Sequence, residues 1–387
     1  MTFKSIFNKV LESIKPTEDE FNHVQNKIKN FVNELQTKIS NAKIILGGSM
    51  AKGTWIKSKY DADVFVQFNF EEYKDKNLSE ELEKGLKGYD YTKLHGSRDY
   101  FQIEDEITYE IVPTLEIKDA NEALNITDAS PLHTKWVCEN SDETLRDEIR
   151  LTKQFFKANK LYGAESYIKG FSGYVLEILT IHHGSFLKFI KAAKKYGEKQ
   201  VIDTNKHHKD VFFEVNSSKL TSPLIVIDPT QAGRNASAAL SDEVYNKFLE
   251  VVAKFLENPS TEFFTEKEFN INELKEKDNT IIIECTPVDG KIDIVGCKLE
   301  KVFKFFKRMF EKNDFMIEEC DWEFKNNLLM YFSFNKYELD EIKEVIGPAE
   351  SFEQGADGFR KKYPSAEVIE GKWTAKVNRE FLKPDAI

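Results

Sequence analysis

The chain has 387 residues, of which 41% are hydrophobic and 31% charged, and its formal net charge is −11 at pH 7. This composition excludes a disordered chain, and the length is enough for two or three domains with their own cores. No apolar run reaches the ~18 residues that a membrane span needs, so we expect no membrane partner.

The amphipathic first residues, "MTFKSIFNKVLESI", include an acid and are not typical of a secretory signal. The four cysteines show no CxxC spacing. The absence of CxxC pairs makes a zinc site an unfavoured interpretation, and scattered cysteines are typical of free thiols in a reducing compartment. We therefore expect a cytoplasmic protein.

The first elements predict a small domain with a mixed sheet. Residues 17–39 carry an apolar stripe with helical spacing, and Thr17 with Glu20 fits a capping box at its start. The segments "AKIILGG" and "DADVFVQF" have the pattern of strands. The segment "YFQIEDEITYEIVPTL" predicts a hairpin that turns near residues 104–106.

The second of these strands places two acids on one face. Side chains alternate along a strand, so Asp61 and Asp63 share the face opposite an apolar row. On its own this pattern is more often a solvated strand end. The residues just before it favour another interpretation, because Gly48 and Ser49 precede a short helix and can leave backbone N–H groups free for an anion. With Lys52 nearby, the stretch predicts a nucleoside triphosphate carried with Mg²⁺.

A third acid lies in the hairpin. Glu110 is a carboxylate inside an otherwise apolar strand, where it needs a partner. Two-metal phosphoryl transfer uses acids from neighbouring strands, so Glu110 is the candidate third ligand. The alternatives are a strand-edge acid in solvent and a pair with a lysine. The acids of the turn itself are weaker candidates because water surrounds them.

The middle of the chain is predicted to be mostly helical. Four basic residues at helical spacing along "SDETLRDEIRLTKQFFKANK" form a stripe that either contacts RNA or is a solvated face; they are Arg146, Arg150, Lys153 and Lys157. A net negative charge argues only mildly against RNA, since a local basic surface is enough. Further on, residues 175–196 predict one buried helix, "PLIVIDPT" a buried strand, and Ser241 the cap of a helix through Phe255.

The region "ENPSTEFF" is predicted to be a domain boundary. Beyond it the expected order is strand 280–285, helix 298–312, strands 315–322 and 327–335, helix 350–362 and strand 372–378. This β-α-β-β-α-β order is typical of a ferredoxin-like fold. Lys304 and Arg308 on its first helix could hold RNA phosphates, or that helix could simply have a solvated basic side.

Longer blocks of the chain resemble one family. Residues 130–186, "DPTQAGRNASAALS" and "GPAESFEQGADGFRKKYP" are similar to the conserved blocks of the archaeal-type (class I) CCA-adding enzymes. These are tRNA nucleotidyltransferases of the polymerase-β superfamily. The resemblance covers nearly the whole chain, and the Gly-Ser and Asp-x-Asp stretch fits the superfamily signature.

The resemblance implies an α+β protein in three parts: a polymerase-β-like nucleotidyltransferase head (1–133), a helical central domain (134–258) and a ferredoxin-like C-terminal RNA-binding body (259–387). It implies an enzyme that restores the 3′-terminal CCA of tRNA from CTP and ATP, without a nucleic-acid template and with two Mg²⁺ ions. Its partners would be the 3′ end and acceptor arm of tRNA. The implied catalytic metal ligands are Asp61, Asp63 and Glu110. The implied nucleotide-binding residues are Gly48, Ser49, Lys52, His133, Lys153, Tyr162 and Arg234.

The sequence departs from the family pattern at several places. Glu110 stands where the family usually has Asp, and Lys52 replaces a usual arginine, which loses a bidentate fork but keeps the charge. "DPTQAGRN" lacks an acid that often precedes the arginine, and a short C-terminus would reduce recognition of the tRNA elbow. Two alternatives stay open: an enzyme of partial specificity that adds only A or CC or polyadenylates RNA, and a catalytically weak RNA-binding relative. The intact Asp61 and Asp63 argue against the second.

Overall fold

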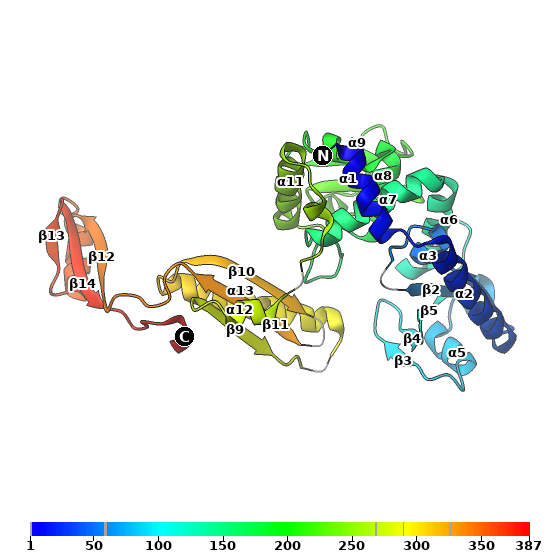
Figure 1. The fold of residues 1–387 in the computed structure, drawn as a ribbon, viewed down its shortest axis with the longest axis horizontal. Coiled ribbons are helices and arrows are strands. Elements are labelled where there is room, and N and C mark those ends of the chain that lie inside the picture. The colour runs from blue at the N-terminus through cyan, green and yellow to red at the C-terminus, as the bar shows by residue number, and fades with distance from the viewer. Residues whose placement is uncertain (1, 58–59, 268, 289, 325–326) are drawn as a thin grey trace. The chain divides into compact units, whose positions relative to one another are not determined.

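The computed structural model describes residues 2–57, 60–267, 269–288, 290–324 and 327–387. The chain forms two compact units, Met1–Lys267 and Glu268–Ile387. In Figure 1 the first runs from blue to green and the second from yellow to red. The three-part division predicted from the sequence stays a prediction. Within the described ranges, every helix is too short or too polar to cross a membrane.

A mixed five-stranded sheet lies near the start of the first unit, with the order β1-β2-β5-β4-β3. Its strands are β1 (Ala42–Leu46), β2 (Asp61–Asn69), β3 (Thr92–Leu94), β4 (Tyr100–Glu104) and β5 (Thr108–Glu116). β2 and β5 run parallel, and the other neighbours are antiparallel. The mixed sheet, the two early strands and the β4–β5 hairpin are therefore confirmed.

Helices cover the apolar face of this sheet. Helix α2 (Glu18–Lys38) begins with the predicted capping box between Thr17 and Glu20 and buries Val24 and Ile28 against the sheet core. The strand residue Val64 is fully buried in the same cluster. The shorter helices of this region are α3 (Gly48–Lys52), α4 (Phe70–Tyr73) and α5 (Leu78–Gly85). Because this face is fixed by burial, the opposite face of β2 and β5 is left for polar groups.

The rest of the first unit is a helical body with a small sheet. Its helices are α1 (Phe3–Ile14), α6 (Ser130–Glu139), α7 (Glu143–Ala158), α8 (Gly173–His183), α9 (Phe186–Ala193), α10 (Val211–Glu214) and α11 (Asp242–Glu257). The sheet has the order β6-β7-β8, from β6 (Gln200–Asp203), β7 (Leu224–Asp228) and β8 (Gln231–Asn235). Helix α1 packs here, beside α7, although it begins the chain (Figure 1).

Two predictions for this body are confirmed and one is wrong. β7 is buried throughout, and the Ser241 side chain accepts a hydrogen bond from the Val244 N–H at the start of α11. The single helix expected over 175–196 is instead two helices, α8 and α9. Gly184 has a φ of +76°, in the left-handed region that favours glycine, and Ser185 then caps α9.

The second unit has two three-stranded sheets. The first has the order β10-β11-β9, from β9 (Thr280–Cys285), β10 (Ile317–Phe324) and β11 (Leu328–Phe334), and packs on α13 (Ile292–Lys312). The second has the order β12-β14-β13, from β12 (Ile342–Ala349), β13 (Glu367–Ile369) and β14 (Lys372–Asn378). The other helices are α12 (Ile271–Lys275) and α14 (Glu353–Lys362).

The α+β class is confirmed, but a single ferredoxin-like sheet is the wrong arrangement for this unit. The first three expected strands do form one sheet in the ferredoxin-like order. The last expected strand, β14, pairs instead with β12 and β13. The sequence prediction missed β12, in which Lys343-Glu344 and Gly347-Pro348 resemble a loop, and β12 pairs along one edge of β14.

Candidate active site

The three candidate acids lie on one face of the first sheet. β2 and β5 pair in parallel with Asp61 beside Thr108 and Asp63 beside Glu110. Partners across a parallel pair point to the same face, with their strands about 4.8 Å apart. The structure thus brings together residues that are 47 positions apart in the sequence, as the alternation of each strand predicted.

These carboxylates repel one another. Burial raises the pKa of Glu110 to about 7, and the charges of Asp63 and Asp61 add to the shift. Burial also raises the pKa of Asp63; Lys52 opposes this rise, and Asp61 strengthens it. A cluster of this kind carries unfavourable charge that a bound cation would relieve.

The donor set fits a hard divalent cation held with help from a substrate. All three groups supply carboxylate oxygen, the donor that such cations prefer. Among the residues that the structure describes, no three His, Cys, Asp or Glu side chains stand together as a ready-made cage. Small divalent cations are commonly bound by one or two carboxylates with water and substrate phosphates, so an open site agrees with this chemistry.

A glycine turn lies directly against Asp63. The Gly47 N–H donates to the Asp63 carbonyl at 2.7 Å, and Gly48 has a φ of +56°. A Cβ atom on Gly48 would lie 1.6 Å from Asp63 Oδ2, so no larger residue fits there without a shift. Ser49 follows on α3 and is partly exposed. The turn therefore brings the backbone next to the acid face.

Lys52 and Lys153 converge on a glutamate that the sequence prediction missed. Lys52 Nζ lies 2.8 Å from Glu177 Oε2, and Lys153 Nζ lies 2.7 Å from Glu177 Oε1. Thr54 Oγ1 accepts from Lys153 at 3.0 Å and donates to Glu177 Oε1 at 2.9 Å. The only sequence signal for Glu177 was an acid within the apolar run "VLEILTI".

The exposed basic stripe predicted for α7 is wrong at two of its four positions. Lys153 is buried, and so is Arg150, which donates to the Trp55 carbonyl at 3.0 Å and to the Gly53 carbonyl at 2.6 Å. These contacts fix the segment Gly53–Trp55 that follows α3. The Arg150 side chain therefore does not belong to a solvent-facing stripe. Arg146 is partly exposed and Lys157 is exposed, and RNA contacts by these two stay predictions.

The two basic residues named in the second unit lie on the solvent side of α13. Lys304 and Arg308 are exposed, and Lys304 Nζ lies 2.6 Å from Glu300 Oε1 one turn earlier. Such a pair is also what a solvated helix face would show. Contact between these residues and RNA stays a prediction.

His133 and Arg234 meet at a second missed acid, Asp228. His133 Nε2 lies 3.1 Å from Asp228 Oδ2, Arg234 forms an ion pair with the same oxygen, and the Tyr174 hydroxyl donates to Oδ1 at 3.0 Å. The His133 ring stacks on Tyr174 with centroids 4.2 Å apart. Although burial alone would raise the pKa of Asp228, His133 and Arg234 hold it well below its ordinary value. The acid that the sequence lacks just before Arg234 thus comes from the end of β7.

Tyr162 lies close to Lys153. A Cβ atom on Gly173 would lie 2.8 Å from the Tyr162 hydroxyl and 3.8 Å from Lys153 Cε, so both side chains flank this glycine. The Lys157 ammonium lies 5.1 Å from the centre of the Tyr162 ring. Two of the predicted nucleotide-binding residues, Lys153 and Tyr162, therefore lie together at the start of α8.

A cavity of about 230 Å³ opens beside the acids. Asp63 and Glu110 line one side of it, and the loop before β4, with Gly96, Ser97 and Arg98, lines another. The sequence prediction gave this loop no role.

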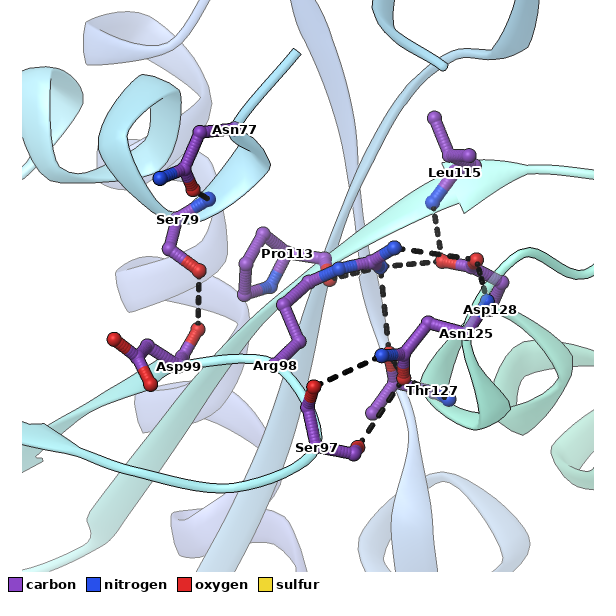
Figure 2. Close-up of polar contacts among 10 residues, drawn as sticks. All are labelled: Asn77, Ser79, Ser97, Arg98, Asp99, Pro113, Leu115, Asn125, Thr127 and Asp128. Atoms are coloured by element: carbon purple, nitrogen blue, oxygen red, sulfur yellow. Dashed lines mark hydrogen bonds and ion pairs between the residues drawn. The ribbon is translucent and has the colours of Figure 1, made fainter. Parts of the chain in front are cut away.

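Figure 2 shows how the loop is held. Arg98 pairs with the buried Asp128 and donates to the Pro113 carbonyl at 3.0 Å, while Ser79 Oγ donates to the Asp99 carbonyl at 2.8 Å. Asp128 also accepts from the Leu115 N–H at 2.9 Å. The cavity wall is therefore fixed from two sides.

Three family models match successive parts of the chain. Residues 1–147 match the Second Messenger Oligonucleotide or Dinucleotide Synthetase domain, and residues 147–265 match the second domain of tRNA nucleotidyltransferase. Residues 281–387 match the C-terminal domain of CCA-adding enzyme.

Several curated proteins are similar over most of their length. The CCA-adding enzyme of Methanocaldococcus jannaschii is 31% identical over 98% of this chain and 89% of its own. That of Nanoarchaeum equitans is 33% identical over 84% of this chain and 81% of its own. Among solved structures, a cytoplasmic RNA terminal U-transferase covers 69% of this chain and 100% of its own, with a TM-score of 0.52 and 13% identity, which shows a shared fold.

We predict that Glu110→Gln stabilises the metal-free protein. Between the ordinary pKa of 4.5 and the folded value of about 7, the folded chain binds more protons than the unfolded chain. The contribution of Glu110 to the free energy of unfolding therefore falls as pH rises through this window. With a chelator at about pH 8, calorimetry should show the variant melting a few degrees above wild type, with the gain vanishing near pH 4.5.

Divalent cation should reverse this order at about pH 8, since it stabilises the ionised wild-type cluster more than the variant. Glu116→Gln, at an exposed position at the end of the same strand, is the matched control and should leave melting unchanged. A metal-free Glu110→Gln protein that melts below wild type would show that the ionised Glu110 carboxylate does not destabilise the fold.

We also predict that Arg98→Met destabilises the first unit by about 3 kcal/mol, because it leaves the buried Asp128 carboxylate without its cation. The measurement is urea unfolding of Arg98→Met, Asp128→Asn and the double variant. The double variant should lose at least about 1 kcal/mol less than the sum of the single changes. Additive losses would mean that the two residues stabilise the loop independently.

Proposed function

This chain belongs to the CCA-adding enzymes, the tRNA nucleotidyltransferases of archaeal type, and we propose that the acid face of its first sheet is where the reaction takes place. The enzyme adds the 3′-terminal CCA of tRNA from CTP and ATP without a nucleic-acid template. The observation that carries the assignment of the site is the register that sets Asp63 beside Glu110, on the face shared with Asp61.

In the proposed mechanism Asp61, Asp63 and Glu110 would hold two Mg²⁺ ions. When bound, such ions activate the acceptor hydroxyl and neutralise charge on the triphosphate. The terminal ribose 3′-hydroxyl would lose its proton to solvent as its oxygen bonds to the α-phosphorus, the bond from that phosphorus to the bridging oxygen would break, and pyrophosphate would leave. Glu110 is one methylene longer than the usual aspartate, and its place beside Asp63 supports the same role for it.

Cationic and polar groups would orient the triphosphate. The Gly48 turn brings backbone close to Asp63, and Ser49 follows it with a partly exposed side chain. Lys52 and Lys153 supply two ammonium groups from different elements, and Tyr162 flanks Lys153. We assign these residues to the triphosphate and sugar, in agreement with the family resemblance.

The Asp228 cluster would hold the base. His133 and Tyr174 form a stacked pair whose polar edges are fixed by Asp228. The same carboxylate orients the Arg234 guanidinium, which is about a quarter exposed (26%). The Arg234 guanidinium can therefore be oriented by Asp228 and still contact a ligand through its exposed part.

The tRNA acceptor arm would contact exposed basic groups. Arg146 and Lys157 on α7 are candidates in the first unit, and Lys304 and Arg308 in the second. We place the reaction in the cytoplasm, where free thiols are the default.

The function is tested with tRNA that ends at the discriminator base. The full chain is incubated with this tRNA and Mg²⁺, and with CTP, ATP or both. We expect two added C residues with CTP alone and complete CCA with both nucleotides. Addition of only A or only CC in the presence of both nucleotides would indicate partial specificity, and no addition would contradict the function.

Asp63→Asn should lower the rate of nucleotide addition by several orders of magnitude. The amide keeps the shape of the side chain but removes an anionic oxygen ligand, while tRNA binding depends on other groups. Single-turnover addition and a tRNA binding titration separate the two effects. Asp75→Asn, at an exposed position of the same domain, is the control. Wild-type rates in Mg²⁺ for Asp63→Asn would remove the basis of the metal assignment.

Arg234→Ala should harm base choice as well as rate. Cytosine and adenine both present an amine beside a ring nitrogen acceptor, whereas uracil and guanine present a carbonyl there. A guanidinium only donates, so it can satisfy the ring nitrogen, at about 1–3 kcal/mol per bond. The measurement is kcat/KM for CTP and for UTP with wild type and variant. An unchanged CTP/UTP ratio with equally reduced rates would make Arg234 a positioning contact only.

A further inference from the structure

Glu177 occupies an unusual position in the first unit. It lies inside the apolar helix α8 and is 1% exposed, yet its two carboxylate oxygens bind two different lysines. Lys52 belongs to α3 and Lys153 to α7, so one carboxylate connects three elements. All three charged groups are buried, at 7%, 5% and 1% exposure for Lys52, Lys153 and Glu177.

The charges of this cluster do not balance. Two ammonium groups share a single carboxylate, which leaves one positive charge in a buried place. A buried charge that is only partly balanced is costly, so an anionic ligand is the expected further partner. Both lysines also act on Asp63, whose pKa burial raises and their charges lower. The excess positive charge therefore lies within electrostatic reach of the acid face.

We propose that Glu177 is a positioning residue of the nucleotide site. It holds the ammonium groups of Lys52 and Lys153 side by side, so that together they bind the phosphate oxygens of one nucleoside triphosphate. This inference rests on the proposed function, which assigns both lysines to the triphosphate. The competing explanation is a purely structural connection between the sheet and the helical body.

Lys153 is the member that depends most on Glu177. Burial lowers the pKa of Lys153, the Glu177 charge raises it, and the neighbouring Lys52 charge lowers it again. Without the carboxylate, the lowering influences of burial and of the Lys52 charge would be opposed, among the groups named here, by the Asp63 charge. The charged or titratable groups facing Lys153 are Lys52, Asp63, Lys157, Tyr162 and Glu177.

The test is CTP binding by the full chain in Mg²⁺, measured by calorimetry from about pH 6 to about pH 9. No tRNA is present, so binding is observed without turnover. At about pH 8, Glu177→Gln should bind CTP about 10- to 100-fold more weakly than wild type, as expected for loss of a charged contact. Because binding must then return a proton to Lys153, the ratio of the two dissociation constants should fall as pH is lowered.

Two further variants supply an independent test and a control. Lys153→Met removes the group through which Glu177 acts, so it should weaken CTP binding, and adding Glu177→Gln should then bring no new pH dependence. This measurement decides the matter even if Glu177→Gln alone does not fold. Glu148→Gln is the matched control, because Glu148 is a half-buried acid whose carboxylate accepts from the Phe186 N–H at 2.8 Å; it should change melting but not CTP binding.

The outcomes separate this inference from the proposed function. If Glu177→Gln binds CTP like wild type at every pH, or if Lys153→Met binds it like wild type, Glu177 is a structural connection and the inference is overturned. Addition of CCA by the wild-type chain in the tRNA assay would leave the function standing in that case. A wild-type chain that neither binds CTP nor extends tRNA would overturn both.

Discussion

The parallel pairing of β2 with β5 is the constraint on which the site depends. It sets Asp63 beside Glu110, and a shift by one residue would bring Tyr109 or Ile111 next to Asp63 and turn Glu110 toward the core. Both tyrosine and isoleucine are buried on the far face. Hydrophobic burial on that face therefore fixes the register, and the position of the acids follows from the core rather than from any attraction between them.

Placing three carboxylates on one face destabilises the fold through their mutual repulsion, and cations from other elements oppose this repulsion. The acids gather on β2 and β5, while the cations that oppose them come from α3 and α7 and are held by Glu177 on α8. The contact between the sheet and the helical body is thus made partly of ionic groups. A cluster with excess negative charge faces one with excess positive charge, and a metal–triphosphate complex carries charges of both signs with which to match them.

The sequence predicted what depends on local pattern. Strand alternation placed Asp61, Asp63 and Glu110 on one face, and the apolar stripe of α2 and its capping box were right. It failed where a partner lies far along the chain, since Glu177 is 125 residues from Lys52. Lys153 had the spacing of an exposed stripe, but helical spacing says which residues share a face and not what covers that face. β12 was missed because the adjacent Lys343 and Glu344 interrupt its alternation and Gly347-Pro348 is typical of a turn.

Burial of these cations explains how an acidic chain can handle polyanions. Lys52, Arg150 and Lys153 are all buried, where charges are screened little by water or salt. A few such groups suffice for a small, highly charged triphosphate that enters among them. In the proposed function only the 3′ end of the tRNA reaches the acid site, and the phosphates of its acceptor arm are proposed to contact exposed cations such as Arg146 and Lys157, whose attraction falls with ionic strength. If the proposed sites are correct, added salt should weaken tRNA binding before it weakens nucleotide binding, and the net charge of −11 bears on the surface contact with tRNA.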